Sequence, residues 1–515
     1  MIKNKSVKKI KKVLVSVYNK SQIIPFIKIL NENNIEIIST GGTKKILEEN
    51  KIRVTSVESI TQYPSILGGR VKTLHPKIFG GILNRSEIQA DVDELKKHEI
   101  STIDMVIVDL YPFLETTKQT KDHDKIIEKI DIGGVSLIRA SAKNYKEVLI
   151  IPSISSSTEI LQKLINQNFF TSLEDRLFYA KKAFEITSQY EIDIAKYFDK
   201  YNTDTNKLSK TFTHYISKSQ KLRYGENPHQ KGRYYGDLEK LFTQLNGKEL
   251  SYNNLLDLDA AINLMEEFDE TSFGILKHNN ACGFATCENI LSSWNKALAG
   301  DPISAFGGVL VTNSHVDIHV AKEINKLFFE ILIAPSFCEE SLELLKTKKN
   351  RIILKKKNIN LGEVSFRSVL NGVLSQDKDH ITDDENIETV TEINASKKQM
   401  EDLKFASKIC KHTKSNAIVL VKNKQLIGLG CGQTSRVDAL NQAILKAEKF
   451  GFILDGSVMA SDAFFPFPDC VQIAQTKGVS AVIQPGGSKN DNLSIDYCNK
   501  NDMAMVFTGN RHFKH

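Results

Sequence analysis

The chain has 515 residues, of which 41% are apolar and 25% are charged, and this composition excludes a wholly disordered chain. The length exceeds what one ordinary hydrophobic core supports, so two to four domains are expected. The formal net charge of +7 comes from charges spread along the chain. Such a distribution favours small anionic ligands over a dedicated nucleic-acid surface, so no nucleic-acid partner is expected.

The cysteines and the apolar runs indicate the compartment. Seven cysteines lie at irregular spacings, which predicts reduced thiols rather than a disulfide framework. No run of about 18 apolar residues is present, so no membrane span is expected. The basic N-terminal stretch leads into a short apolar run that is typical of a strand rather than a signal peptide, and a cytoplasmic location is therefore expected.

In chain order, residues 1–200 alternate short β-branched runs with helical stretches. Strands are expected at 12–18, 36–40, 104–113 and 147–152, and helices at 21–34, 43–50 and 172–200. Alternation of this kind is typical of a mostly parallel sheet covered by helices, with ligands bound at the carboxyl ends of the strands.

Residues 201–515 begin with a polar connection at 201–215 and continue as a second αβ series. Its strands are expected at 273–278, 307–313, 417–423, 425–430, 457–462, 480–485 and 503–509, and its helices include 255–268 and 437–450. A polar segment at 375–399 splits this series into two halves. The pieces SAFGG (304–308) and SDAFF (461–465) fall in comparable places in the halves, a faint hint of duplication.

Three glycine-containing polar turns mark the first domain: STGGT (39–43), GGRVKTLHPK (68–77) and DIGGVSLIRASAKN (131–144). Glycine lets backbone approach an anion closely, and hydroxyls and first-turn helical amides donate to it. If residues 70–74 are extended, Arg70, Lys72 and Leu74 share one face. STGGT alone could equally be a helix cap after a glycine turn. Together, the three turns favour a phosphate pocket.

Other cofactor signatures are missing from the chain. It has no G-x-x-x-x-G-K-[ST] loop, and GLGCGQ (428–433) lacks the third glycine of a dinucleotide fingerprint, so ATP and NAD are disfavoured. His278, Cys282 and Cys287 lack the paired Cys-x-x-Cys of zinc sites, and the zinc deaminase pattern is absent. No metal is therefore expected.

In the second half, Lys277 and His278 form the most suggestive pair. A neighbouring ammonium favours a neutral imidazole that can accept a proton, although a structural histidine beside a solvated lysine is the simpler interpretation. ASDAFFPFPD (460–469) is either a core loop or a wall on which a flat heterocycle stacks, with Asp469 at its edge. Arg511 near the C-terminus is either solvated or docked on a phosphate.

These motifs together resemble a known family. GGRVKTLHP, DIGGVSLIRASAKNY, LRYGENPHQ, LNGKELSYNNLLDLDAA, the Lys-His pair, GQTSRVDA and SDAFFPF occur in this order across nearly the whole chain. They are similar to the bifunctional purine-biosynthesis enzymes that join IMP cyclohydrolase to phosphoribosylaminoimidazolecarboxamide (AICAR) formyltransferase. The resemblance implies formyl transfer from 10-formyltetrahydrofolate to AICAR, then dehydrative closure of formyl-AICAR (FAICAR) to IMP, without a metal.

The resemblance also implies the architecture. Residues 1–200 would form a methylglyoxal-synthase-like parallel αβ domain, and residues 201–515 a transferase domain of two cytidine-deaminase-like halves without the zinc, split near 375–399. Members of the family are homodimers whose transferase sites form between subunits, so a homodimer is expected.

Carried over position by position, the resemblance implies these site residues. The cyclohydrolase residues would be Lys72, Tyr111, Asp131 and Lys143, with substrate contacts from Lys20, Thr40, Gly41, Gly42, Thr43, Arg70 and Thr73. In the transferase, His278 would be the base supported by Lys277. Nucleotide contacts would come from Arg223, Tyr224, Phe306, Gly307, Glu330, Asn416, Arg436, Phe464 and Arg511, and folate contacts from Val437, Asp469, Ser488 and Lys489.

The chain departs from the family pattern at Tyr18, Asn19, Asp109, Ala281 and Pro468. Asp109 places an anion close to a phosphorylated ligand, and Tyr18 replaces a small hydroxyl. These departures bear on substrate affinity more than on reaction type. The alternatives are a protein that retains only the transferase and, in a different class, a non-catalytic phosphosugar-binding or nucleic-acid-binding protein.

Overall fold

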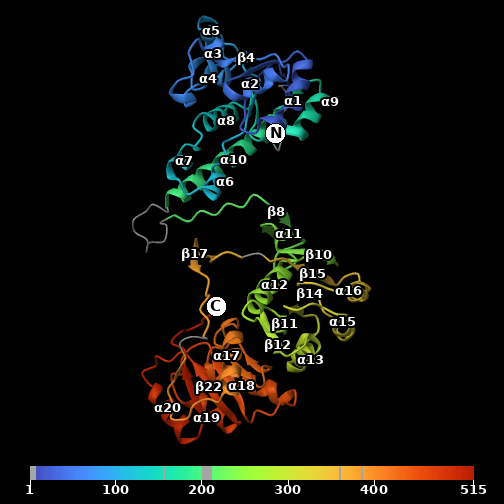
Figure 1. Ribbon diagram of the computed structural model, residues 1–515, viewed down its shortest axis with the longest axis vertical. Helices are drawn as coiled ribbons and strands as arrows, with labels where there is room; N and C mark the ends of the chain where they lie inside the picture. Colours follow the sequence, from blue (N-terminus) through green and yellow to red (C-terminus); the bar gives the residue numbers. More distant parts are fainter. Residues whose placement is uncertain (1–6, 155–156, 200–210, 359–360, 384–386) are drawn as a thin grey trace. The chain divides into compact units, whose positions relative to one another are not determined.

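The computed structural model describes residues 7–154, 157–199, 211–358, 361–383 and 387–515. The chain divides into two compact units, residues 1–215 and 216–515 (Figure 1). The expected boundary at 200/201 falls within residues 200–210, outside the described residues. In the described part of the chain, no helix is long and apolar enough to cross a membrane.

The first unit is built on a parallel sheet with the strand order β4-β3-β2-β5-β6. Its central strands are continuous apolar runs whose residues are almost all buried, as expected for strands covered on both faces. The strands are β2 (Lys12–Ser16), β3 (Glu36–Ser39), β4 (Thr55–Ser56), β5 (Met105–Val108) and β6 (Leu149–Ile151).

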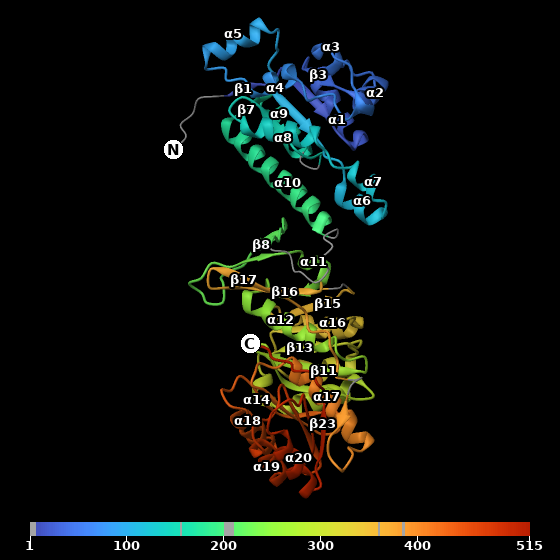
Figure 2. The ribbon, with the colours of Figure 1, turned by 90° about the vertical axis from the view of Figure 1, so that its left-hand side faces the viewer.

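Helices of very different lengths lie between and after these strands, and α10 runs alongside α8 (Figure 2). The helices are α1 (Lys20–Glu32), α2 (Gly41–Glu49), α3 (Val57–Thr61), α4 (Pro76–Leu83), α5 (Gln89–Lys97), α6 (Phe113–Gln119), α7 (His123–Ile127), α8 (Gly133–Lys143), α9 (Ser157–Asn166) and α10 (Leu173–Asp199). A short 3₁₀ turn, η1 (Leu67–Gly69), lies between α3 and α4, and β1 (Lys8–Lys9) pairs with β7 (Phe170–Thr171).

The order of the strands determines where a ligand can bind. From β2 the chain proceeds to β3 and β4 on one side, and then returns to place β5 on the other side of β2. In open parallel sheets, ligands bind outside the carboxyl ends of the strands where the order reverses. In this unit the strand order reverses between β2, which ends at Ser16, and β5, which ends at Val108. A ligand is therefore expected between the segments that follow these two strands.

The second unit contains two six-stranded sheets. The first has the order β10-β15-β14-β13-β11-β12, and the second has the order β18-β23-β22-β21-β19-β20. The strands are β10 (Phe242–Asn246), β11 (Ser272–Lys277), β12 (Asn280–Thr286), β13 (Val309–Thr312), β14 (Ile331–Ala334), β15 (Ile352–Lys356), β18 (Glu388–Thr389), β19 (Ile418–Val421), β20 (Leu426–Gly430), β21 (Ser457–Ser461), β22 (Val479–Gln484) and β23 (Ala504–Phe507).

The two sheets have the same topology, strand for strand. In each, the first strand pairs antiparallel with the last, the last three are parallel, and the remaining two pair antiparallel. The corresponding helices are α12 (Tyr252–Met265) with α17 (Lys397–Lys411), α13 (Ile290–Gly300) with α18 (Arg436–Lys449), α15 (Ile318–Asn325) with α19 (Asp469–Thr476), and α16 (Glu339–Lys346) with α20 (Asp491–Lys500). The unit is therefore an internal duplication at the level of topology.

The pair of sequence pieces that hinted at duplication was wrong in detail. SAFGG overlaps α14 (Pro302–Ala305) and precedes β13, whereas SDAFF begins at the last residue of β21, the counterpart of β13. The two pieces have similar residues, but they lie at opposite ends of equivalent strands.

The two sheets meet at their outer strands, β12 and β20. The backbone N–H of Thr286 donates to Lys424 O (3.0 Å), and Ala285 and Gln425 form an antiparallel bridge. Buried side chains from both halves form one continuous hydrophobic cluster, so the halves share a core.

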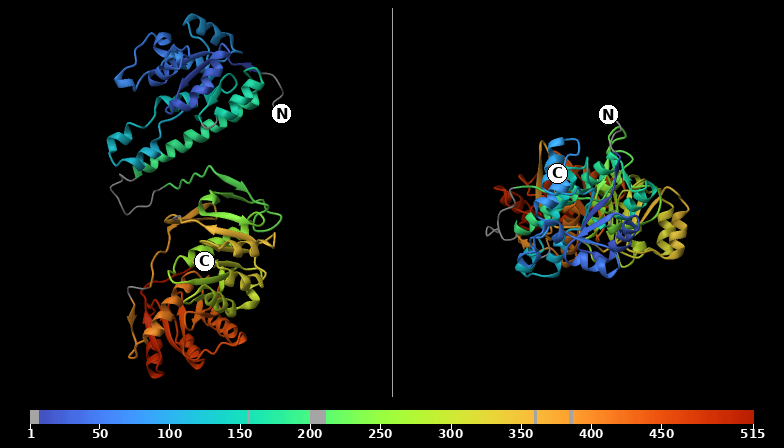
Figure 3. Two further views of the ribbon diagram at one scale, coloured as in Figure 1. Left: turned by 45° about the vertical axis from the view of Figure 1, so that its right-hand side comes forward. Right: turned by 90° about the horizontal axis from the view of Figure 1, so that it is seen from above.

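Smaller elements complete the second unit, which Figure 3 shows from two further sides. They are β8 (Ser219–Lys221) paired with β9 (Arg233–Tyr235), α11 (Leu238–Leu241), and the hairpin of β16 (Val364–Val369) and β17 (Gly372–Asp377). Nearly every residue of this hairpin is exposed, including Phe366, Leu370 and Leu374.

Candidate functional site

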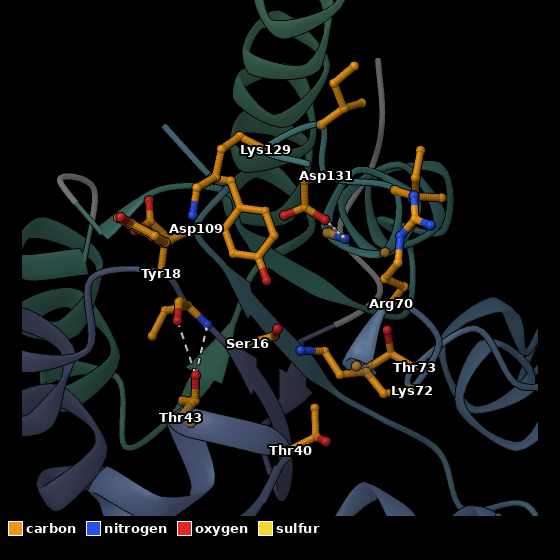
Figure 4. A pocket seen from close by; sticks show the side chains of 18 of the residues that line it. Ser16, Tyr18, Thr40, Thr43, Arg70, Lys72, Thr73, Asp109, Lys129 and Asp131 are labelled. Carbon is orange, nitrogen blue, oxygen red and sulfur yellow. Dashed lines mark hydrogen bonds between the residues drawn. The ribbon is translucent and has the colours of Figure 1, made fainter. Parts of the chain in front are cut away.

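A cavity of about 370 Å³ lies at the carboxyl edge of the parallel sheet in the first unit (Figure 4). Segments far apart in the sequence converge on it, including those after β2, β3 and β5 and the start of α8. Of the expected cyclohydrolase residues, those that line it are Lys20, Thr40, Gly42, Thr43, Arg70, Lys72, Thr73, Tyr111 and Asp131.

Three helices, α1, α2 and α8, begin at this cavity, so first-turn amides that lack intrahelical acceptors lie around it. Thr40 precedes α2, but its hydroxyl donates to Glu58 Oε1 (2.6 Å) and does not cap the helix. A Cβ at Gly42 would lie 3.0 Å from Lys20 Cε, so glycine allows this lysine to cross the start of α2. Gly41 is not a lining residue, although a Cβ at this position would lie 3.7 Å from Lys72 Nζ.

The segment that carries Arg70 and Lys72 does not meet the condition of an extended chain, since Arg70 has helical φ and ψ angles of −69° and −26°. Leu67, Gly68 and Gly69 all have positive φ angles, of 53°, 64° and 93°, and form the 3₁₀ turn η1. The turn nevertheless brings residues 70–74 to the cavity wall. Arg70 is largely exposed and lies 3.7 Å from Glu128 Oε1, which is a weak surface pair.

Asp131 is fixed by its own helix. Its Oδ1 accepts a hydrogen bond from the Gly134 backbone N–H (2.7 Å), and a Cβ at Gly134 would lie 2.5 Å from Asp131 Oδ2. Burial raises the pKa of Asp131, while the Gly134 N–H, Tyr111 and the Lys72 charge partly oppose that rise. Figure 4 shows the Lys72 and Asp131 side chains entering the same space from different walls.

Tyr190, on α10, forms hydrogen bonds with the backbone that precedes α8. Its hydroxyl donates to Lys129 O (2.9 Å) and accepts from the Asp131 N–H (2.8 Å). The ring is buried and packs edge-on against Phe113. Burial raises the pKa of Tyr190 to about 12, so the hydroxyl keeps its proton near neutral pH.

Lys129 and Glu128 also line the cavity, and sequence reasoning missed both. The Lys129 ammonium lies 5.7 Å from the Tyr18 ring centroid and 5.6 Å from that of Tyr111, within range of cation–π attraction. The two tyrosine rings themselves meet edge-on, 5.7 Å apart. Tyr18 thus belongs to an aromatic and cationic corner of the cavity.

Asp109 lines the same cavity and accepts a hydrogen bond from the Asn19 backbone N–H (3.2 Å) at the start of α1. Burial raises the pKa of Asp109, and the nearby Glu115 charge adds to the rise. The carboxylate therefore occupies a helix N-terminus at which an anionic ligand would otherwise be stabilised.

Lys143 lies in the last turn of α8, exposed to solvent. The start of that helix faces the cavity, and ten residues of helix place Lys143 about 15 Å further along. It is not among the lining residues, and its role in proton transfer stays a prediction.

In the second unit, His278 and Asn279 form the two-residue turn between β11 and β12. Both have positive φ angles, 51° and 65°, as in the type I′ turn that suits a tight hairpin. A histidine in this region costs roughly 1–3 kcal/mol of conformational strain, which often marks a functional position. His278 is exposed at the tip, and Lys277 Nζ donates to Phe306 O (2.7 Å), joining two expected site segments.

Arg436 gathers a second group of expected residues. Its guanidinium donates to Asn416 Oδ1 (3.0 Å), to Phe464 O (3.3 Å) and to Asp462 Oδ1 (2.9 Å). Asp462 is buried and was not expected in the site. Within the described part of the chain, Arg436 Nε and Asp462 Oδ2 are buried without a hydrogen-bond partner.

The other expected transferase residues occupy separate local settings. Arg223 stacks over Tyr224, with 4.6 Å from Cζ to the ring centroid, and Arg511 stacks over Phe513 at 4.4 Å. Glu330 pairs with Lys248 (2.9 Å), and the backbone N–H of Gly307 donates to Phe328 O (2.8 Å). Val437 and Asp469 lie in the first turns of α18 and α19, and Ser488 and Lys489 precede α20.

Two of the residues that depart from the family pattern, Ala281 and Pro468, lie in or next to regular secondary structure. Ala281 lies in β12, paired with Leu276 and buried, although a residue other than proline at this position was expected to loosen the turn beside His278. Pro468 directly precedes α19 and leaves Asp469 as its first residue. In the described residues, no group of three or more His, Cys, Asp or Glu side chains is arranged to hold a metal ion.

Known proteins match this chain over nearly its whole length. The AICARFT/IMPCHase bienzyme family matches residues 141–446, and the MGS-like domain family matches residues 22–136. A bifunctional purine biosynthesis protein PurH from Bacteroides thetaiotaomicron is 54% identical, covering 99% of each chain. PurH proteins from Caldicellulosiruptor saccharolyticus and a Thermoanaerobacter species are each 46% identical, covering 98% of this chain and 100% of theirs.

These matches agree with the parallel sheet of the first unit and the two αβ halves of the second. The chain therefore belongs to the AICARFT/IMPCHase bienzyme family: it is a bifunctional enzyme of purine biosynthesis that transfers a formyl group from 10-formyltetrahydrofolate to AICAR and closes the product to IMP.

Proposed function

We propose that the cavity of the first unit is the cyclohydrolase site. The observation that carries this proposal is the convergence of Lys72 and Asp131 on one cavity bounded by the starts of three helices. Helix N-termini and Lys20 would hold the phosphate of FAICAR, while Lys72 and Asp131 would lie beside the reacting groups.

Ring closure needs no external electrons. The carboxamide nitrogen attacks the formyl carbon, the formyl oxygen gains negative charge, and water is then lost. Lys72 would stabilise the developing oxyanion, and orientation of the two groups within one molecule supplies much of the rate. A carboxyl such as Asp131, whose pKa is raised by burial, is a better proton acceptor than an ordinary carboxylate. Tyr111 and Lys143 are assigned to this site by resemblance.

We propose that formyl transfer takes place around Lys277 and His278. His278 would accept a proton from the weakly nucleophilic 5-amino group of AICAR, and Lys277 would stabilise the oxyanion formed on the formyl group. The Arg436, Asn416 and Phe464 group, with Arg223, Tyr224, Phe306, Gly307, Glu330 and Arg511, would bind the nucleotide. Val437, Asp469, Ser488 and Lys489 would bind the folate.

We also propose that the enzyme is a homodimer. The β16–β17 hairpin exposes apolar side chains on a two-stranded sheet, and such a sheet is marginally stable by itself. We propose that a second copy of the chain covers this hairpin, because members of the resembled family are expected to be homodimers. A cytoplasmic location is supported by the seven cysteines, all of which are free thiols.

Two single substitutions test the division of labour. We expect His278→Ala to abolish formyl transfer while leaving the closure of supplied FAICAR intact, and Lys72→Ala to do the reverse. Product masses should be followed after mixing the protein with AICAR and 10-formyltetrahydrofolate, against FAICAR without protein. With Lys72→Ala, FAICAR should accumulate.

The outcomes separate the two assignments. Loss of both activities in a folded His278→Ala variant would contradict two independent sites. An unaltered rate of closure in Lys72→Ala would remove Lys72 from the cyclohydrolase site. Wild-type protein that accumulates FAICAR would indicate that Tyr18 and Asp109 have impaired the first unit.

A further inference from the structure

The hairpin turn that carries His278 is held by a carboxylate on a neighbouring helix. The backbone N–H of Asn279 donates to Asp257 Oδ1 (2.7 Å), and Asp257 lies on α12. Burial raises the pKa of Asp257, while the Asn279 N–H and the charge of His278 oppose that rise. Asp257 and His278 are therefore close enough to interact electrostatically.

The second half of the unit contains the same arrangement without a histidine. Its connection between β19 and β20, residues 422–425, has Asn423 and Lys424 at its centre, and both have positive φ angles (54° and 51°). Both backbone N–H groups of this turn donate to Asp402, Asn423 to Oδ2 (2.8 Å) and Lys424 to Oδ1 (2.7 Å).

Asp257 and Asp402 occupy equivalent places in the duplicated fold. Each is the sixth residue of its helix, α12 beginning at Tyr252 and α17 at Lys397. Both helices start with a capping box, formed by Ser251 with Asn254 and by Ser396 with Gln399. A carboxylate anchoring the adjacent hairpin is thus a repeated feature of the fold.

The Asp257 anchor matters more than the Asp402 anchor because the turn that Asp257 holds carries His278. A histidine with positive φ is strained, and such a conformation persists only where the surroundings enforce it. Asp257 supplies a charge-assisted hydrogen bond to the residue next to His278. Lys277 Nζ holds the other side of the turn through Phe306 O, and Asn280 Nδ2 donates to His278 O (2.9 Å).

We propose that Asp257 is a positioning residue of the formyl-transfer site, whose carboxylate fixes the turn that presents His278 to the amino group of AICAR. Asp402 anchors a turn that carries no base. This inference rests on the proposal that His278 is the base of formyl transfer. It adds a residue that acts through His278 rather than on the substrate.

The test compares matched variants of the full-length enzyme. With Asp257→Ala, we expect kcat for formyl transfer to fall about 10-fold to 100-fold, since a displacement near 1 Å can cost about 100-fold. KM for AICAR should change less than about threefold, because the variant leaves the substrate contacts in place. Closure of supplied FAICAR in the first unit should be unaffected and reports that this unit is folded, while the retained KM for AICAR reports that the second unit is folded.

Two further variants make the result specific. Asp257→Asn keeps an acceptor for the Asn279 N–H, so it should retain more formyl transfer than Asp257→Ala. Asp402→Ala removes the equivalent anchor from the second half and should keep kcat for formyl transfer within about threefold of wild type, since its turn lacks a base.

The outcomes distinguish this inference from the assignment of His278. Retention of formyl transfer by His278→Ala would overturn both. Loss of transfer in His278→Ala with wild-type kcat in Asp257→Ala would overturn the positioning role alone. Equal losses of kcat in Asp257→Ala and Asp402→Ala would overturn it as well, because the anchor would then be a general requirement for folding.

Discussion

Asp109 places a carboxylate in a cavity that we propose binds a phosphorylated substrate. Repulsion between two like charges that share a solvated cavity costs on the order of 1 kcal/mol, or about fivefold in binding. We therefore expect Asp109→Asn to lower KM for FAICAR by about threefold to tenfold with little change in kcat, because asparagine still accepts from the Asn19 N–H.

The pH dependence provides the control for this prediction. Burial raises the pKa of Asp109, so the wild-type carboxyl becomes neutral at a higher pH than an ordinary aspartate. The difference in KM between wild type and Asp109→Asn should therefore shrink as pH falls, when measured on supplied FAICAR. An equal or higher KM in the variant at pH 8 would show that Asp109 does not repel the substrate.

At the scale of single residues, the sequence identified side chains that stand next to glycine turns. Lys72 and Asp131 were found in this way, and both line the cavity. Lys129 and Asp257 were missed, because a charged residue in a polar segment or helix looks like a solvated surface residue. Asp462 was not singled out within the motif 460–469. The roles of these three residues depend on partners that are distant in the sequence, such as Tyr190 for the Lys129 segment.

At the scale of elements, the C-terminal segment 508–515 is tied down by a buried histidine. His512 Nδ1 lies 2.6 Å from Asp379 Oδ2, and its Nε2 lies 3.2 Å from Asp383 Oδ1. Burial alone would lower the pKa of His512, but the hydrogen bonds and charges of the two aspartates raise it to about 9. Asp383 also accepts from Ser407, and Lys411 contributes a nearby cation.

The sign of the resulting pH dependence follows from the raised pKa. The stabilisation is fully present below the unfolded-state pKa of about 6.5 and is lost as pH rises through about 9. We expect the hydrogen-exchange protection of the His512 and Lys514 amides to decrease between these values. These amides donate to Asp462 O and Ser415 Oγ.

His512→Gln is the matched variant for this measurement. Its segment should show low protection at every pH, whereas amides in β22 should behave as in wild type. Protection that stays constant from pH 6.5 to 9 in wild type would show that the protonated histidine does not hold the segment.

Element prediction from the sequence succeeded where a strand or helix has a strong pattern of its own. The apolar runs of β2, β5, β19 and β22 were predicted as strands for this reason. Strand β12 was missed because NACGFAT lacks alternation, and only pairing with β11 makes it a strand. The turn η1 was missed because its shape depends on positive φ angles rather than on side-chain periodicity.

At the scale of the whole molecule, the exposed hairpin predicts self-association. We expect Phe366→Asp combined with Val373→Asp to convert the proposed dimer to monomers, because charges on this exposed apolar face would oppose its burial. Light scattering after size exclusion measures the change. Formyl transfer should be lost and FAICAR closure retained if the transferase sites form between subunits.

Leu493→Asp is the control, since it places a charge on an exposed apolar residue of α20 outside the hairpin. It should leave the mass unchanged. A double hairpin variant that keeps the mass of the wild type would exclude the hairpin from the dimer interface.

The sequence predicted the two-part organisation and the αβ class of each part, because alternation along the chain carries that information. It could not show the identical strand order of the two halves. That identity resides in pairings between distant segments, such as β10 with β15 and β18 with β23, and the residues that pair share no common motif.

The antiparallel contact between β12 and β20 covers one exposed edge of each sheet in the second unit. Equivalent strands of equivalent halves meet, as two copies of one half would meet across a twofold axis. A half-length chain would have needed a second copy to cover this edge, at a cost that depends on its concentration. Within one chain this contact does not depend on protein concentration, and the equivalent turns of the two halves carry different residues, His278 and Asn279 in the first and Asn423 and Lys424 in the second.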